Sequence, residues 1–214
     1  MVWIPPLTRI APQSIQRYDP PMSEALSIHQ NLYAQLQALP EHLTGEIIAG
    51  ELVVSPRPAV RHSIAGRGIG DAIGPRFHLR RPGGDDAPGG WWILNEQELH
   101  LGDDVLVPDV AGWKRERVPK MPDTVGVTIV PDWVCEILSP STASRDKKQK
   151  ARRYHAAGIQ WYWLVDPRDR TVEAFRREGE FWVLVGVWSD DEKARIEPFD
   201  AVELDLSRWW EDLE

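Results

Sequence analysis

The sequence predicts an α/β fold built on one mixed sheet. Segments with helical periodicity and strand-like apolar segments occur in the order helix, strand, strand, strand, helix, strand. This order favours a single layered α/β domain with a partly antiparallel sheet. The length of 214 residues suits one domain. The hydrophobic share of 42% and the charged share of 27% are typical of a globular protein and exclude a disordered acidic chain.

Three segments have the 3.6-residue periodicity of helices. Residues 23–40 place leucines on one face and end at Pro40. Residues 62–79 also have helical spacing, although this segment contains four glycines and Pro75, and each interior glycine costs about 1 kcal/mol relative to alanine. Residues 144–157 follow a break at 139–142 and are closed by Gly158, the residue that most often ends a helix.

The predicted strands are short runs of β-branched, aliphatic and aromatic residues bounded by turn residues. Two hairpins are expected, one around Ala49-Gly50 at the N-terminal side and one around Glu178-Gly179 at the C-terminal side. Pro108 indicates an edge or a bulge in its strand. The expected strands are 46–48, 51–54, 91–101, 105–114, 133–138, 160–165, 171–176 and 181–188.

We expect three regions along the chain. Residues 1–22 are rich in proline and form an extended arm, residues 23–196 form one domain, and residues 197–214 form an acidic, tryptophan-containing tail packed on it. Residues 80–90 form an exposed loop. Eleven tryptophans, several in close pairs, suit a core or a dimer interface. The pairs and the arm together suggest a homodimer.

Charge and cysteine content narrow the function classes. The net charge is −8, but residues 140–153 carry six basic residues and one acid. The protein is therefore not expected to bind polyanions in general, and this segment is either a place that holds phosphate or a solvated basic helix face. One cysteine, Cys135, excludes an internal disulfide and a Cys-x-x-Cys metal site. No apolar run reaches the roughly 18–20 residues of a membrane helix, and the proline-rich start is unlike a signal peptide. We therefore expect a cytoplasmic protein that has no membrane partner.

Three acids stand in apolar surroundings: Glu98, Asp109 and Glu136. A carboxylate inside a strand is costly unless a cation pairs with it. Side-chain alternation places Glu136 with Val134, and it places Asp109 with Ala111 on one face of the preceding strand. If the two strands are neighbours, Asp109 and Glu136 meet and suit Mg²⁺, which keeps several waters. The alternative is that each acid pairs with an arginine in a core.

The basic segment supplies a third component. Asp146, Lys150 and Tyr154 are spaced four apart and share one helix face. Tyr154 is the one large apolar side chain of that helix, so its face is expected to contact the sheet. A lysine directed at two carboxylates can hold a nucleophilic water and offset charge on a phosphate. The alternative is that the Lys150 amine extends to solvent.

Several motifs resemble a known family. They are Pro108-Asp109, the stretch PDWVCEILSPST at 131–142, and GIQWYWLVDP at 158–167 after the Asp146-Lys150-Tyr154 spacing. Together they resemble the bacterial "putative restriction endonuclease" family, a former domain of unknown function within the PD-(D/E)XK nuclease superfamily. The resemblance covers residues 40–190, and Glu46 and His62 resemble its N-terminal part. It implies a restriction-endonuclease-like core, with an N-terminal helix and hairpin and a C-terminal hairpin added.

The resemblance also implies a chemistry. Asp109 matches the aspartate of the PD motif and Glu136 the acid of the (D/E)XK motif, so the two imply Mg²⁺ (or Mn²⁺) ligands in an enzyme that cleaves DNA. Leu138 stands where the superfamily has its lysine, and Lys150 is the matching position in the following helix. Glu98 or Glu46 is a candidate further ligand. Other candidates for the site are His62, Asp146 and Tyr154.

Two other functions remain open from the sequence. The first is a catalytically silent nuclease fold that acts as an interaction or nucleic-acid-binding module, which the acidic net charge favours because DNA binding depends on neutralising phosphates. The second is a Cys–His hydrolase using Cys135, which alternation disfavours because it places Cys135 opposite Glu136, in a strand core. The sequence does not indicate a recognition site.

Overall fold

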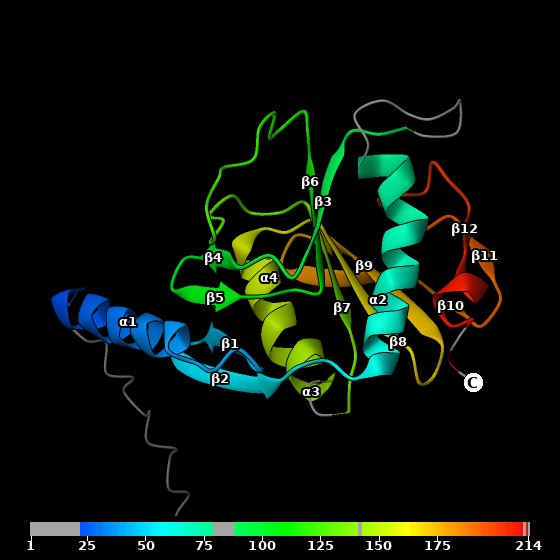
Figure 1. Cartoon of the computed structure of the whole chain (residues 1–214). Coiled ribbons are helices and arrows are strands. Elements are labelled where there is room, and N and C mark those ends of the chain that lie inside the picture. The colour runs from blue at the N-terminus through cyan, green and yellow to red at the C-terminus, as the bar shows by residue number, and fades with distance from the viewer. Residues whose placement is uncertain (1–21, 79–87, 141–142, 212, 214) are drawn as a thin grey trace, which may run out of the picture.

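The computed structural model describes residues 22–78, 88–140, 143–211 and 213 (Figure 1). The predicted arm lies outside the described residues except for Met22, as does most of the predicted 80–90 loop. The described part of the chain begins with helix α1 (Met22–Gln37) and the hairpin of β1 (Leu43–Ile48) and β2 (Glu51–Pro56), both as predicted. No helix within the described ranges is both long and apolar enough to cross a bilayer.

A six-stranded sheet forms the centre of the molecule, in the order β10-β9-β8-β7-β6-β3. The β7–β8 pair is parallel and the other pairs are antiparallel. Helix α2 (Val60–Ile73) packs on one face and α4 (Ala151–Ala157) on the other, so the core order helix, strand, strand, strand, helix, strand is α2-β3-β6-β7-α4-β8. The strands are β3 (Trp91–Asn95), β6 (Val110–Lys114), β7 (Trp133–Ile137), β8 (Trp161–Asp166), β9 (Thr171–Glu178) and β10 (Phe181–Ser189).

A second, four-stranded sheet has the order β2-β1-β5-β4, with β4 (Leu99–Leu101) and β5 (Asp104–Leu106). The predicted single strands 91–101 and 105–114 were therefore wrong, because each one is divided between the two sheets. The chain leaves the large sheet at Glu96, whose positive φ of 49° breaks the strand, and it returns to that sheet through Pro108 and Asp109. Pro108 thus marks the passage between sheets rather than a bulge.

Both helices that flank the large sheet contain a π-helical turn. Helix α2 (Val60–Ile73) continues into η1 (Gly74–His78), and the second helix consists of α3 (Ala143–Arg145), η2 (Asp146–Lys150) and α4 (Ala151–Ala157). Gly158 ends it in the left-handed conformation with φ 90°, as predicted. One of the unfavourable glycines of α2 has a packing reason: a Cβ on Gly68 would lie 2.6 Å from the Cα of Trp209.

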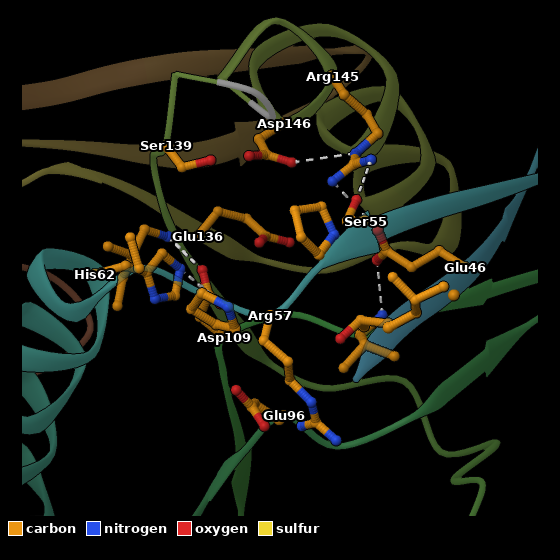
Figure 2. A pocket seen from close by; sticks show the side chains of 18 of the residues that line it. Glu46, Ser55, Arg57, His62, Glu96, Asp109, Glu136, Ser139, Arg145 and Asp146 are labelled. Carbon is orange, nitrogen blue, oxygen red and sulfur yellow. Dashed lines mark hydrogen bonds and ion pairs between the residues drawn. The ribbon is translucent and has the colours of Figure 1, made fainter. Parts of the chain in front are cut away.

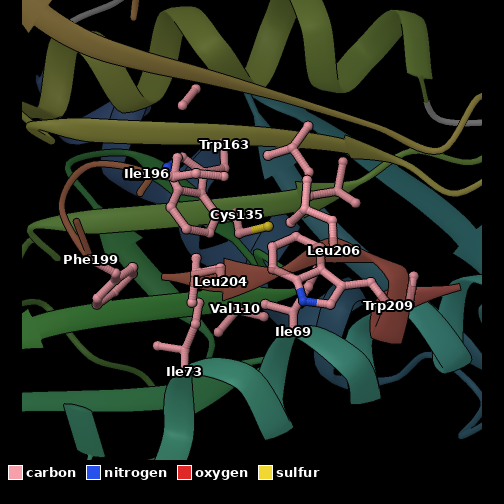
Figure 3. Close-up of a cluster of buried hydrophobic side chains, with 14 of the residues drawn as sticks. Ile69, Ile73, Val110, Cys135, Trp163, Ile196, Phe199, Leu204, Leu206 and Trp209 are labelled. Carbon is pink, nitrogen blue, oxygen red and sulfur yellow. The ribbon is translucent and has the colours of Figure 1, made fainter. Parts of the chain in front are cut away.

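The core consists of two clusters separated by the large sheet. One cluster lies between the sheet and α2 and contains Cys135 and many of the tryptophans (Figure 3). The other lies on the α4 side and includes Tyr154 and Leu138. Trp163 packs against both Trp133 and Trp209. Trp91, Trp113, Trp133, Trp163, Trp209 and Trp210 are therefore core residues, in agreement with the core part of the prediction.

The last segment folds back onto the α2 side. Strands β11 (Lys193–Ala194) and β12 (Leu204–Asp205) pair, and the 3-10 helix η3 (Leu206–Trp209) contributes Leu206 and Trp209 to the core cluster. This packing holds α2 against the sheet, and it thereby fixes the position of the His62 side chain at the N-terminal end of that helix.

Candidate active site

A cleft of about 580 Å³ lies between the two sheets, at the end of β7 (Figure 2). It is lined by side chains from β1, from the Leu106–Val110 passage, from β7 and from η2. The cleft contains most of the candidates from the sequence: Glu46, His62, Glu98, Asp109, Glu136, Asp146 and Lys150. Tyr154 lies just behind it, bonded to Glu136.

Glu136 projects from β7 toward α4 and is 3% exposed. Its Oε1 accepts a hydrogen bond of 2.5 Å from the Tyr154 hydroxyl and lies 2.6 Å from the Lys150 amine. Burial raises the pKa of Glu136 well above its usual value; Lys150 opposes this effect, and the charges of Asp146, Asp109 and Glu46 add to it. The alternation argument for this strand is confirmed, because Cys135 and Glu136 lie on opposite faces.

Lys150 is buried with Tyr154, as their spacing on one helix face predicted. Its amine lies 2.6 Å from Glu136 and 2.8 Å from Glu46, and it donates a 3.3 Å hydrogen bond to the Val107 carbonyl. Burial lowers the pKa of Lys150, but the negative charges of Glu136 and Glu46 outweigh this effect and raise the pKa above its usual value. The amine is therefore charged and does not extend to solvent.

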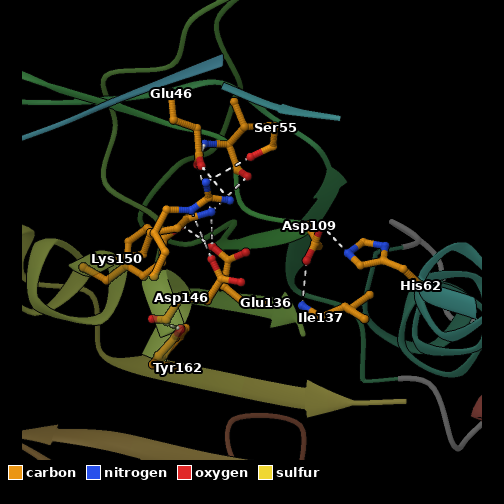
Figure 4. Close-up of polar contacts among 12 residues, drawn as sticks. Glu46, Ser55, His62, Asp109, Glu136, Ile137, Asp146, Lys150 and Tyr162 are labelled. Carbon is orange, nitrogen blue, oxygen red and sulfur yellow. Dashed lines mark hydrogen bonds and ion pairs between the residues drawn. The ribbon is translucent and has the colours of Figure 1, made fainter. Parts of the chain in front are cut away.

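Asp109 is in the bend before β6 rather than inside a strand, so the alternation used to predict its direction does not apply. The β6–β7 register nevertheless places it beside Glu136, because the neighbouring pair is Val110 with Cys135. Asp109 Oδ2 accepts a 2.6 Å hydrogen bond from the Ile137 backbone, and Oδ1 lies 3.1 Å from His62 Nε2 (Figure 4). The Asp109 carboxylate is therefore held from β7 and from α2.

His62 is the residue of the candidate site that comes from α2. Burial lowers the pKa of His62, but the hydrogen bond and the charge of Asp109 outweigh that effect, and the pKa is raised above its usual value. The His62 side chain is 14% exposed and faces the cleft. The contact with Asp109 therefore stabilises the protonated form of His62 more than solvent does.

Glu98 and Glu96 differ from the sequence-based expectation. Glu98 precedes β4 and is not on the strand next to Asp109; Tyr33 donates a 3.0 Å hydrogen bond to it, and His100 lies 2.7 Å away. Glu96, which the sequence argument passed over, lies at the cleft, and its backbone N–H donates to the Asp109 carbonyl. A glutamate directly after a strand-like run was the signal available for it.

Asp146 and Arg145 complete the polar surroundings. Asp146 is 3% exposed, its carbonyl accepts a hydrogen bond from Tyr162, and its carboxylate lies 3.7 Å from Arg145 Nε. Arg145 also donates to Ser55 at 2.9 Å. The sequence argument counted Arg145 as part of a basic segment and did not place it here. Lys148, by contrast, is exposed on the outer helix face.

The donor set fits a divalent cation of the Mg²⁺ type. Within the described ranges, no three His, Cys, Asp or Glu side chains are gathered closely enough to hold a metal on their own. Mg²⁺ commonly binds through one or two carboxylates and completes its shell with water and phosphate oxygens. Asp109 and Glu136 supply such hard oxygen donors in one cleft. Burial is the first cause of the raised pKa of Glu136, and the charges of Asp146, Asp109 and Glu46 add to it; a bound cation would oppose this rise.

Fold and site together define a protein with the restriction-endonuclease-like fold. The model of the Uma2 family, described as "Putative restriction endonuclease", matches residues 21–207, and the chain belongs to this family. A crystal structure of "a putative nuclease belonging to DUF820" from Anabaena variabilis is similar, with 22% sequence identity, a TM-score of 0.63, and coverage of 84% of this chain and 97% of that chain. No curated protein matches the chain. The family and fold expected from the sequence motifs are thus confirmed.

Proposed function

We propose that the protein is a Mg²⁺-dependent endonuclease (Mn²⁺ being an alternative ion) that hydrolyses phosphodiester bonds in DNA. The observation that carries this proposal is the meeting of Asp109, Glu136 and Lys150 in one cleft. These residues come from three separate elements: the passage before β6, strand β7 and η2. Two carboxylates beside a buried lysine suit phosphoryl chemistry, in which charge must be balanced on a phosphate.

Asp109 and Glu136 would hold the metal ion. When bound, Mg²⁺ supplies a Lewis acid that polarises the phosphate and lowers the pKa of water. The Lys150 ammonium, held beside Glu136, would offset the negative charge that develops on the phosphate. Tyr154 keeps Glu136 in place through its hydroxyl hydrogen bond. His62 does the same for Asp109.

The shape of the site favours cleavage within a strand. A second cleft of about 560 Å³ adjoins the first and shares part of its lining, including His62, Glu96, Asp109 and Ile137. Asp109 and His62 thus line two adjoining clefts. A nucleic acid with a phosphodiester at Asp109 would have room to continue beyond the first cleft, which an endonuclease requires.

Supercoiled plasmid DNA provides the test. We expect nicking and linearisation in Mg²⁺, no cleavage in EDTA, and loss of cleavage in Asp109→Asn, Glu136→Gln and Lys150→Ala. Asp103→Asn changes an exposed acid in the β4–β5 turn and serves as the matched control. Cleavage that persists in EDTA, or that survives Asp109→Asn or Glu136→Gln in a folded protein, would reject the mechanism.

A second function is a catalytically silent nuclease fold that binds nucleic acid or a protein partner. The ion pairs of Lys150 favour this function, since Glu136 and Glu46 already balance the positive charge of its amine. The net charge of −8 also weakens attraction to DNA. Calorimetric titration with Mn²⁺ separates the two: binding that is lost in Glu136→Gln supports the enzyme, whereas DNA binding without any metal binding supports the silent module.

A further inference from the structure

We propose that Glu46 is a positioning residue that fixes the Lys150 ammonium at the site, and that it is not a metal ligand. The proposal rests on the function proposed above for Lys150 and Glu136. It gives a role to the four-stranded sheet, which lies outside the central helix–strand order and which brings Glu46 to the cleft on β1.

The Lys150 ammonium has three donors, and three acceptors surround it. They are Glu136 at 2.6 Å, Glu46 at 2.8 Å and the Val107 carbonyl at 3.3 Å. The Lys150 side chain is 3% exposed and that of Glu46 is 6% exposed, so water does not compete freely at this place. With a single carboxylate partner a lysine stem could rotate, whereas three acceptors from three elements define one position.

Glu46 also holds the segment that leads to Asp109. Its Oε1 accepts a 2.9 Å hydrogen bond from the Val107 backbone N–H, while the Val107 carbonyl accepts from Lys150. Glu46, Val107 and Lys150 thus form a closed triangle of contacts. Glu46, a side chain of the four-stranded sheet, therefore fixes the position of the Lys150 amine and of the segment that leads to Asp109.

The same contacts make Glu46 a poor metal ligand. Oε1 is bonded to the Lys150 cation and to a backbone N–H, and Oε2 lies 3.8 Å from Arg145. Two cations, Lys150 and Arg145, face this carboxylate, whereas one cation faces each proposed ligand: Lys150 at Glu136 and His62 at Asp109. Leu138, directly after β7, packs in the apolar cluster on the α4 side, and the lysine reaches the site from η2 instead.

Three variants test the assignment. Glu46→Gln keeps an oxygen acceptor without the charge, Glu46→Asp keeps the charge on a shorter stem, and Glu51→Gln changes an exposed acid of the same sheet as the control. For each variant we would measure the Mn²⁺ dissociation constant by calorimetry, kcat and KM on plasmid DNA, and the urea midpoint without metal. The urea measurement for Glu46→Gln is repeated in a Lys150→Met background.

We expect Glu46→Gln to leave the Mn²⁺ dissociation constant within about threefold of wild type and to lower kcat about 10- to 100-fold with little change in KM. Glu46→Asp should recover part of kcat. The urea midpoint shift from Glu46→Gln should nearly vanish in the Lys150→Met background, because the partner has been removed.

Three results would overturn the assignment. A loss of Mn²⁺ binding as large as that of Glu136→Gln would make Glu46 a ligand. An unchanged kcat, or an equal urea midpoint shift in both backgrounds, would remove its link to Lys150. If the wild-type protein cleaves nothing, the proposed function fails. The comparison of urea midpoint shifts in the wild-type and Lys150→Met backgrounds still decides whether Glu46 holds Lys150.

Discussion

Replacing Lys150 with methionine should destabilise the folded protein strongly, whether or not it is an enzyme. Lys150 balances Glu136 at 2.6 Å and Glu46 at 2.8 Å, and the two carboxylates are 3% and 6% exposed. Breaking a buried ion pair from one side costs about 3–5 kcal/mol, because the remaining charge is left without a partner. For a chain of this length, 1 kcal/mol corresponds to roughly 2–4 °C in Tm, so we expect a decrease of about 6–20 °C.

The pH dependence gives this prediction a sign. Burial already raises the pKa of Glu136, and removal of Lys150, which opposes that rise, would raise it further. A carboxyl group whose pKa is higher in the folded state than in the unfolded state favours folding at low pH, and it loses that contribution as pH rises through the folded-state value. The destabilisation by Lys150→Met should therefore be larger at pH 8 than at pH 5.

The assay is thermal and urea unfolding in EDTA at both pH values, followed by circular dichroism. Lys148→Met is the matched control, because Lys148 is exposed on the outer face of the same helix. A Tm decrease below about 2 °C at pH 8, or a decrease of the same size at both pH values, would show that Lys150 does not balance two buried carboxylates.

Three further predictions use other contacts. Tyr154→Phe removes the hydroxyl that donates to Glu136 at 2.5 Å, so urea unfolding should show a loss of about 1.5–3 kcal/mol, and an unchanged stability would contradict the contact. Lys148→Ala, on the exposed helix face, should raise KM for DNA more at low salt than at high salt and leave kcat unchanged. Burial and then Arg115 lower the pKa of His78, so protonation of the unfolded state makes the contribution of His78 to stability fall from pH 7.5 to 5.5. Wild type should therefore lose stability relative to His78→Asn over this range, which urea titrations of both proteins at both pH values would measure; an unchanged difference would contradict the shift.

The local sequence pattern predicted the elements whose structure depends on residues close together in the chain. Strand β7 was predictable because a continuous apolar run with one charge fixes which face each residue takes, and so Cys135 and Glu136 were separated correctly. The inward face of the helix after it followed from the four-residue spacing of Lys150 and Tyr154. Gly158 closed that helix because a left-handed residue is needed there.

The tertiary structure alone decided how the two sheets divide the chain. Residues 91–101 and 105–114 have strand character throughout, and nothing in their local pattern states that each half pairs with a different sheet. The strands with which these segments pair lie far away in sequence, and strand propensity does not predict which strands pair. The direction of the Asp109 side chain was predicted from alternation within a strand. That reasoning was wrong, because Asp109 lies in the bend between the two sheets.

The tertiary structure also decided which residues surround the site. The motifs named Asp109, Glu136 and Lys150, but no spacing along the chain brings Glu46 to the lysine amine or His62 to Asp109. Those contacts exist because β1 joins a second sheet and α2 packs across the first. The sequence by itself named the side chains that are proposed for the chemistry. The packing of distant elements decided which side chains hold them in place, because buried charges must find partners wherever the fold brings them.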